Sequence, residues 1–259
     1  MKGLLSVSFG TSYADTRAKT IDVIDAKLAA AFPDRAFYSA WTSPRIMAKV
    51  LAERGERHDS LDEAFARMSA DGVDDVVVAT MCLMQGGEMR KIAAAVDAWV
   101  AEGGHAARLA EPLLTTPADH EAMARALADE FSHVPDADVV LFMGHGSAMG
   151  PNQLYTDVQA ALHALGKCNF LVATVEGTPT FDDALPQLEA LGAKRVWLAP
   201  LMIVAGDHAR NDLAGDDDES WANQLVARGF ETEVVLKGLG EYSAVQQLAV
   251  DHALVAKEV

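Results

Sequence analysis

Apolar and polar residues follow two different periods along this chain. Short apolar runs rich in Val, Ile and Leu are typical of buried strands, and they alternate with segments whose apolar residues recur on one helical face. The runs predict strands at 3–9, 35–41, 75–84, 107–114, 138–143, 169–175, 195–202 and 231–236. The intervening segments predict helices at 14–31, from 44 onward, and at 62–72, 88–99, 117–131, 152–165, 180–191, 217–228 and 243–256.

Strands that alternate with helices predict an α/β fold of parallel sheets with helices on both faces. The polar segment SHVPDAD (132–138) is the best linker between two halves. We therefore expect an N-terminal α/β lobe at 1–131 and a C-terminal α/β lobe at 138–259, with a cleft between them.

The two halves also match each other residue by residue. Residues 61–88 align without a gap with residues 181–208, and identical pairs include Asp62/Asp182, Gly72/Gly192 and Gly86/Gly206. A helix–strand–turn unit repeated at a constant offset predicts two similar lobes. The alignment places Glu88 of the first half where the second half has His208.

Composition narrows the class of protein. Half of the residues are apolar, which suffices for a core, and 21 basic against 38 acidic residues give a net charge of −17. This charge disfavours nucleic acid, which needs a basic surface. No apolar run is long enough for a membrane helix, and the first apolar run lacks the features of a signal peptide. Cys82 and Cys168 are far apart and are expected to be reduced core thiols, so we expect a cytoplasmic protein.

Four residues that could bind a metal follow predicted strands. His145 follows an apolar run in the segment VVLFMGHGS (139–147), and His208 follows one in VWLAPLMIVAGDH (196–208). Glu176 and Glu88 follow two further predicted strands. The carboxyl ends of parallel strands form the ligand-binding edge of a sheet. Imidazole and carboxylate groups suit a divalent first-row metal. For each residue alone, a helix cap or a solvated turn is the competing interpretation; the two histidines at equivalent strand ends favour a metal site.

Two glycine-containing turns follow strands in both halves. Gly10-Thr11-Ser12 and Gly144-His145-Gly146-Ser147 expose backbone N–H groups, which bind phosphate or carboxylate groups in such turns. Methionines such as Met84 lie near strand ends; core filling explains them, although a large flat apolar ligand would suit them as well.

At these residues the chain resembles a known family. The segments SVSFGTS, GHGS around His145, VEG at Glu176, PLMIVAGDHARNDLAGDDDESW and GLGE (238–241) resemble the CbiK-type sirohydrochlorin cobaltochelatases. These are class II chelatases of anaerobic cobalamin biosynthesis, similar in structure to protoporphyrin ferrochelatase. The resemblance spans nearly the whole chain. It implies two four-stranded parallel sheets with a tetrapyrrole between them, and metal binding by His145, Glu176 and His208, with Glu88 as a nearby modulating carboxylate.

The resemblance also implies an activity. We expect insertion of Co²⁺ into sirohydrochlorin or its precorrin-2 form, with His145, His208 and Glu88 as catalytic groups and His145 taking protons from the macrocycle. The expected substrate-binding residues are Gly10, Thr11, Ser12, Met84, Gly86 and Ser147. No organic cofactor is expected, because the divalent metal, Co²⁺ or Fe²⁺, is itself a substrate. One departure is Cys82, where family members often carry a histidine, and a thiol there could alter metal preference.

The sequence is also compatible with other functions. Iron insertion for sirohaem, or nickel insertion, would use the same residues, because first-row metals share ligands. A tetrapyrrole or metal carrier without catalysis would need the same cleft. A periplasmic-type binding protein for a phosphate-bearing ligand is disfavoured by the lack of a signal peptide. Arg45, Arg90 or Arg210 are candidates for binding substrate carboxylates, and assembly into a homo-oligomer is left open.

Overall fold

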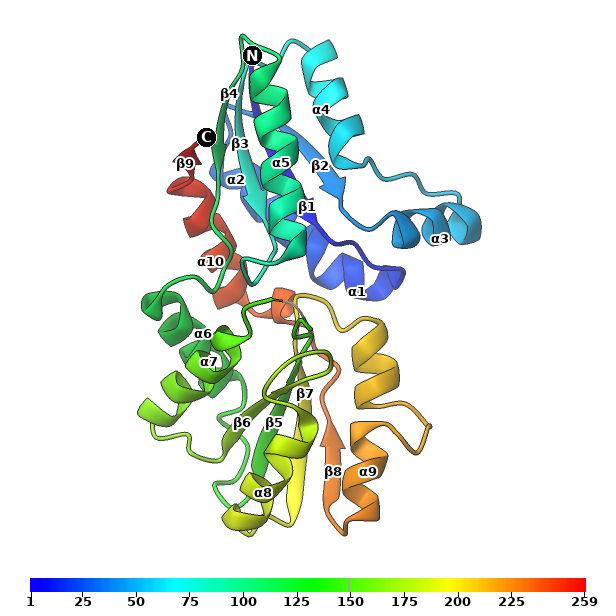
Figure 1. The fold of residues 1–259 in the computed structure, drawn as a ribbon, viewed down its shortest axis with the longest axis vertical. Helices are drawn as coiled ribbons and strands as arrows, with labels where there is room; N and C mark the ends of the chain where they lie inside the picture. Colours follow the sequence, from blue (N-terminus) through cyan, green and yellow to red (C-terminus); the bar gives the residue numbers. More distant parts are fainter. Residues whose placement is uncertain (149) are drawn as a thin grey trace. The chain divides into compact units, whose positions relative to one another are not determined.

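The structure, a computed structural model, describes residues 1–148 and 150–259 as two compact α/β units (Figure 1). Unit 1 comprises Met1–Thr115 and Gln246–Val259, and unit 2 comprises Thr116–Val245. The chain therefore passes from unit 1 to unit 2 and back again.

Unit 1 is built on a five-stranded sheet in the order β2-β1-β3-β4-β9. Its strands are β1 (Lys2–Ser8), β2 (Ala36–Trp41), β3 (Asp75–Thr80), β4 (Ala106–Leu109) and β9 (Lys257–Glu258). The first four run parallel, and β9 is antiparallel to β4. Nearly every residue of β1 and β3 is buried, as expected of parallel strands covered on both faces.

Six helices accompany this sheet among the described residues: α1 (Ala14–Lys19), α2 (Ile21–Ala31), α3 (Pro44–Arg54), α4 (Leu61–Ala70), α5 (Gly87–Ala101) and α10 (Ser243–Leu254), which begins in unit 2. N-capping residues explain where several of these helices begin. Ser43 accepts a hydrogen bond from the Ile46 N–H with Pro44 at the first helical position, and Ser60 and Glu63 form a capping box. The Thr20 hydroxyl donates to the Thr16 carbonyl at 2.7 Å where α1 ends.

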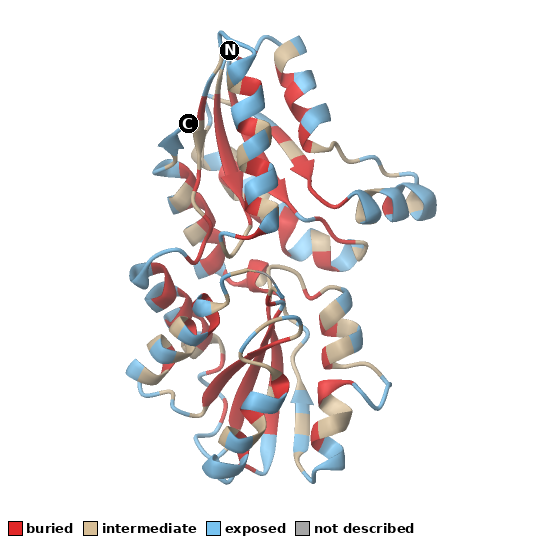
Figure 2. Cartoon of the chain, viewed as in Figure 1, coloured by how far each residue is buried: buried red, intermediate tan, exposed pale blue. Residues whose placement is uncertain are grey.

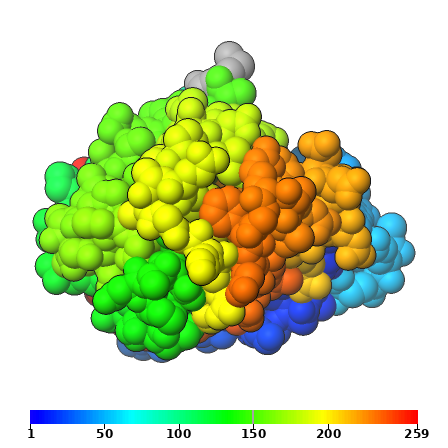
Figure 3. Space-filling model, turned by 90° about the horizontal axis from the view of Figure 1, so that it is seen from below, coloured from blue at the N-terminus to red at the C-terminus, as the bar shows by residue number. Residues whose placement is uncertain are grey.

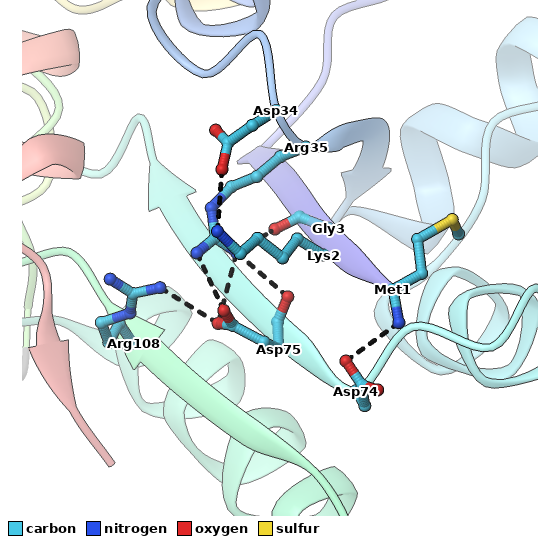
Figure 4. Close-up of polar contacts among 8 residues, drawn as sticks. All are labelled: Met1, Lys2, Gly3, Asp34, Arg35, Asp74, Asp75 and Arg108. Atoms are coloured by element: carbon cyan, nitrogen blue, oxygen red, sulfur yellow. Dashed lines mark hydrogen bonds and ion pairs between the residues drawn. The ribbon is translucent and has the colours of Figure 1, made fainter.

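A charged cluster joins the amino-terminal edge of this sheet (Figure 4). Arg35, whose side chain is 6% exposed, donates to both carboxylate oxygens of Asp75 and to the Gly3 carbonyl. Arg108 on β4 donates to the same carboxylate at 3.0 Å. Burial alone would raise the pKa of Asp75, but donation from Arg35 and Arg108 outweighs it and holds that pKa below its usual value. The cluster therefore joins β1, β3 and β4 at the edge of the sheet opposite the carboxyl ends of these parallel strands.

Unit 2 is built on a four-stranded parallel sheet in the order β6-β5-β7-β8. Its strands are β5 (Val139–Gly144), β6 (Phe170–Thr174), β7 (Arg195–Leu201) and β8 (Glu231–Val234). Residues of β5 and β6 are wholly buried, whereas β8 is an edge strand with exposed positions (Figure 2). A core of side chains such as Leu141, Leu171 and Leu198 packs around this sheet.

The helices of unit 2 are α6 (Pro117–Glu130), α7 (Gln153–Ala164), α8 (Phe181–Leu191) and α9 (Trp221–Ala227), with a π-helical turn η1 (Ala209–Leu213) and a 3-10 turn η2 (Leu239–Glu241). Thr116 and Thr180 form capping boxes at α6 and α8. In Figure 3 residues of unit 2, coloured green to orange, form most of a surface seen from the amino-terminal ends of its strands. His145 follows the opposite, carboxyl-terminal end of β5.

The α/β fold with helix-flanked parallel sheets is as expected, but several elements differ from the sequence prediction. The helix expected at 14–31 is two helices, the helix expected at 217–228 begins at Trp221, and η1 and β9 were not expected. β9 adds an antiparallel fifth strand to the sheet expected to have four parallel ones. The units also divide elsewhere than between 1–131 and 138–259. The reason is that α6 packs against α7 in unit 2, and β9 pairs with β4 in unit 1.

No helix among the described residues is both long and apolar enough to span a membrane. Both cysteines are free thiols; Cys82 is half-buried and Cys168 is exposed.

Candidate metal centre

His145 and Glu176 come from neighbouring strands of unit 2. His145 directly follows β5, and Glu176 lies two residues after β6. Two backbone hydrogen bonds join the segment after β6 to the end of β5: the Val175 N–H donates to the Gly144 carbonyl, and the Glu176 N–H donates to the His145 carbonyl at 2.8 Å. Backbone pairing therefore fixes the separation of these two side chains.

His208 reaches the same edge from the other side of β5. It follows β7 by a connecting segment and directly precedes η1. The buried residues Ala209 and Leu213 anchor η1 in the unit. Single π-helical turns are frequent at functional sites.

The three side chains converge. Their potential ligand atoms all lie within 4.8 Å of one another. The rings of His145 and His208 are perpendicular, with centroids 4.7 Å apart, and the Nδ1 atom of His145 lies 4.0 Å from a carboxylate oxygen of Glu176. Ligand atoms about 2.1 Å from a shared ion lie roughly 3–4 Å apart. A small inward movement would therefore let all three bind one divalent ion.

The contacts of His145 decide which of its nitrogen atoms faces an ion. Its Nδ1 lies 2.9 Å from the Gly146 carbonyl oxygen. A carbonyl can only accept, so Nδ1 carries the proton and Nε2 keeps its lone pair. The side chains of His145 and Glu176 are 48% and 54% exposed, and that of His208 is 31% exposed, so an ion can reach them from solvent.

Two polar side chains, the buried Tyr155 and the half-buried Asn152, hold the turn that carries His145. The Tyr155 hydroxyl accepts from the Gly146 N–H at 2.9 Å, and burial raises the pKa of this tyrosine. The Asn152 side chain accepts from the Ser147 N–H and donates to the Ser147 carbonyl. These bonds fix the turn, and they occupy two of the backbone N–H groups that were expected to bind an anionic ligand.

The remaining predicted substrate residues lie in unit 1. The Thr11 hydroxyl accepts from the Tyr13 N–H, and the Ser12 carbonyl accepts from Arg54 at 2.6 Å. Gly10 has φ +86° and lies directly against the ring of Trp41, where a Cβ atom would come within 2.5 Å of the ring. This turn follows the carboxyl end of β1, as expected, and is held by a bond within the turn region and another from Arg54 of α3.

Met84, Gly86 and Glu88 follow β3. Met84 is half-buried, Gly86 is the buried N-cap of α5, and Glu88 lies in the first turn of that helix. One carboxylate oxygen of Glu88 accepts from Lys91 at 2.6 Å, and the other is buried without a hydrogen-bond partner among the described residues. Glu88 thus lies in unit 1, while the three converging residues all lie in unit 2.

Cys82 lies on the same segment. Burial raises the pKa of its thiol, the Thr80 hydrogen bond opposes this, and the negative charge of Glu88 raises it further. A thiol with a raised pKa stays protonated at neutral pH, and only the thiolate is a good metal ligand.

Comparison with known proteins decides the family. The family model described as cobalt chelatase (CbiK) matches residues 2–258. The chain belongs to the cobalt chelatase (CbiK) family. It is 35% identical over 251 residues to the sirohydrochlorin cobaltochelatase of Salmonella typhimurium, covering 97% of this chain and 94% of that protein. It is 32% identical over 260 residues to the sirohydrochlorin cobaltochelatase CbiKC of Nitratidesulfovibrio vulgaris, covering 98% and 90%.

The fold of this cobalt chelatase family member is shared more widely. SirB from Bacillus subtilis with Fe³⁺ superposes with a TM-score of 0.64 at 11% identity, covering 97% of this chain and 93% of SirB. At that identity the likeness concerns the fold alone.

Three supporting residues were not predicted from the sequence: Asp212, which contacts His208, and Tyr155 and Asn152, which hold the turn after His145. For Asp212 a signal was present, because HARND spaces it four residues after His208 and thus on the same helical face. No comparable spacing identifies Tyr155 or Asn152. Among the arginines considered, Arg45 and Arg90 are exposed in the first turns of α3 and α5, and Arg210 lies half-buried in η1.

Proposed function

We propose that this chain inserts Co²⁺ into sirohydrochlorin, or its precorrin-2 form, and that His145, Glu176 and His208 hold the ion before transfer. The observation that carries this proposal is the convergence within 4.8 Å of ligand atoms from three separate strand ends, in a member of the cobalt chelatase family. Both curated relatives named above are called sirohydrochlorin cobaltochelatases, which supports the choice of metal and macrocycle.

The composition of the centre suits an ion that must be captured and then released. Two neutral imidazoles and one carboxylate give a divalent cation three protein ligands, and other coordination positions stay open for water or for ring nitrogens. All three side chains are partly exposed. Capture therefore requires no deep burial of the ion, and release requires no large opening of the unit.

Metal insertion also requires a base, because the macrocycle loses two pyrrole N–H protons as the ion enters. We assign one of these protons to His145: while the Gly146 carbonyl holds Nδ1, the Nε2 lone pair becomes free to accept a proton once the ion has moved to the ring nitrogens, and the second proton passes to water. Glu88, with one buried carboxylate oxygen that has no hydrogen-bond partner in the described part of the chain, is proposed as a further catalytic group. Gly10, Thr11, Ser12, Met84, Gly86 and Ser147 are proposed to contact the macrocycle.

The direct test mixes the purified protein with sirohydrochlorin and excess Co²⁺ and follows the visible absorption of the macrocycle. An enzyme converts many macrocycles per chain above the uncatalysed rate, whereas a carrier converts at most one. Parallel reactions with Fe²⁺ and Ni²⁺ decide the metal. A faster reaction with Fe²⁺ than with Co²⁺ would replace the cobalt assignment by iron insertion.

Single substitutions test the assigned roles. We expect His145→Ala to lower the insertion rate about 10²–10⁴-fold, because it removes both a ligand and the base. His208→Ala is expected to raise the Co²⁺ concentration needed for half-maximal rate. His133→Ala, at an exposed position outside the centre, is the matched control. Near-normal turnover by a folded His145→Ala variant would remove His145 from the mechanism.

A further inference from the structure

The shortest polar contact of the metal centre joins His208 to a residue outside the ligand group. The Nδ1 atom of His208 lies 2.6 Å from a carboxylate oxygen of Asp212. Asp212 is not one of the three converging ligand residues. It occupies η1, four residues after His208, so its carboxylate and the imidazole lie on one side of the same turn.

The neighbouring residues hold this pair in place. Ala209, which follows His208, and Leu213, which follows Asp212, have no exposed surface. The Arg210 N–H donates to the Gly206 carbonyl where the turn begins, and the Gly215 N–H donates to the Asn211 carbonyl where it ends. The Asp212 carboxylate is therefore set by a backbone anchored in the core.

An ionised carboxylate has only acceptor sites, so the contact requires Nδ1 of His208 to carry a proton. The lone pair is then on Nε2, the nitrogen atom on the far side of the ring from Asp212. Carboxylates that accept from the second nitrogen of a metal-binding histidine fix both the tautomer and the ring orientation, and their loss commonly costs 10–100-fold in metal affinity or activity.

We propose that Asp212 is a positioning residue for metal capture, which holds His208 as the Nδ1–H tautomer with Nε2 directed at the ion. This inference rests on the proposed function, in that the ion to be captured is the metal substrate. Asp212 acts through His208 and does not touch the ion itself.

Two substitutions separate the hydrogen bond from the charge. Asp212→Leu keeps the approximate size and removes the acceptor, whereas Asp212→Asn keeps an acceptor oxygen and removes the charge. Asp216→Asn removes one charge from an exposed position in the same segment and serves as the matched control. Thermal unfolding of each full-length variant shows whether it is folded.

The first measurement titrates each protein with Co²⁺ alone and follows the visible ligand-field bands. We expect Asp212→Leu to weaken binding about 10–100-fold, Asp212→Asn to weaken it less, and Asp216→Asn to bind as the unsubstituted protein does. In the insertion assay the Co²⁺ concentration for half-maximal rate should rise by a similar factor in Asp212→Leu. The rate at saturating Co²⁺ should change much less.

The second measurement reads the tautomer of His208 in the metal-free protein from its ¹⁵N imidazole resonances. The unsubstituted protein should show the Nδ1–H form, and Asp212→Leu a mixture of the two forms. Unchanged Co²⁺ affinity in folded Asp212→Leu, or an Nε2–H tautomer in the unsubstituted protein, would overturn the inference. If the unsubstituted protein binds Co²⁺ but does not convert sirohydrochlorin, the proposed function fails while the affinity and the tautomer still test Asp212.

Discussion

Asp25 on α2 carries a carboxyl group in an unfavourable environment. It is largely buried, and the Ser6 hydroxyl on β1 donates a hydrogen bond to it at 2.6 Å. Burial, opposed by the Ser6 hydrogen bond and assisted by the nearby charge of Asp22, raises the pKa of Asp25 to about 6. The folded protein therefore holds a proton that the unfolded chain releases near pH 4.

This shift predicts a pH-dependent stability. Because the folded pKa of Asp25 exceeds its unfolded pKa, the contribution of Asp25 to the free energy of unfolding should fall by about 3 kcal/mol as pH rises from about 4 to 6, and then level off. Asp25→Asn keeps an acceptor for Ser6 without a charge, so it should be more stable than the unsubstituted protein at pH 7 and lack this dependence. Urea unfolding between pH 4 and 8 measures both, with Asp97→Asn, at an exposed position of α5, as control. Equal stability of the two proteins at pH 7 would contradict the prediction.

At the scale of single residues, the sequence identified the candidates for the centre and missed their supports. His145, Glu176 and His208 could be predicted because each follows an apolar strand, and parallel strands end at one edge. Tyr155 and Asn152 could not, because a buried tyrosine and a helix-flanking asparagine have the same sequence pattern whether or not they bond to a turn. Whether the three converging residues bind a metal stays a prediction.

At the scale of elements, the turn after β5 determines where His145 lies. Gly146 has φ +75°, and a Cβ atom there would lie 2.6 Å from the Gly177 nitrogen, next to Glu176. A side chain at this position would therefore push the β5 and β6 turns apart as well as strain the backbone.

We expect Gly146→Ala to weaken Co²⁺ binding at least 10-fold while the sheet stays folded, because His145 and Glu176 would separate. Gly166→Ala is the matched control: its φ is +81°, but no atom lies within 4 Å of the added Cβ. The control should lose about 1 kcal/mol of stability and keep its Co²⁺ affinity. Co²⁺ titration and urea unfolding separate the two effects, and equal affinities in both variants would show that the turn does not set the ligand geometry.

The alternation of strands and helices was predictable because the two periods of apolar residues differ so strongly. The exceptions have local causes. The Thr20 hydroxyl bonds to the backbone where one expected helix becomes two. η1 is a π-helical turn, with one more residue per hydrogen-bonded turn than an α-helix, and a single such turn is too short to be recognised from the spacing of apolar residues. β9 has two exposed residues, too few for a strand period to appear.

At the scale of the whole molecule, the residues assigned to metal capture are segregated from most of those assigned to the macrocycle. His145, Glu176, His208 and Asp212 lie in unit 2, whereas Glu88 and the turn at 10–12 lie in unit 1. Periodicity predicted two lobes but not their limits, because an amphipathic helix does not reveal which sheet it covers. Hence α6 was assigned to the first lobe although it packs in unit 2, and the end of α10 was assigned to the second although it belongs to unit 1.

This segregation predicts that metal capture and metal insertion can be separated. The fragment Thr116–Val245 contains a complete four-stranded sheet, its own core and every contact described for the metal centre. A domain of this length can fold alone. We expect the purified fragment to bind Co²⁺ with an affinity close to that of the whole chain, because its ligands and their supports are all present. It should not accelerate insertion into sirohydrochlorin, because the proposed contacts of unit 1 are missing.

Circular dichroism establishes whether the fragment is folded, and titration with Co²⁺ followed by its ligand-field bands gives the affinity. The same fragment with His208→Ala is the control for binding at other sites, and it should bind at least 10-fold more weakly. A folded fragment that does not bind Co²⁺ would mean that unit 1 supplies a ligand, and Glu88 would then be the first residue to substitute in the whole chain. A fragment that inserts Co²⁺ at the rate of the whole chain would mean that unit 1 takes no part in the reaction, and the roles proposed for Glu88 and the turn at 10–12 would have to be withdrawn.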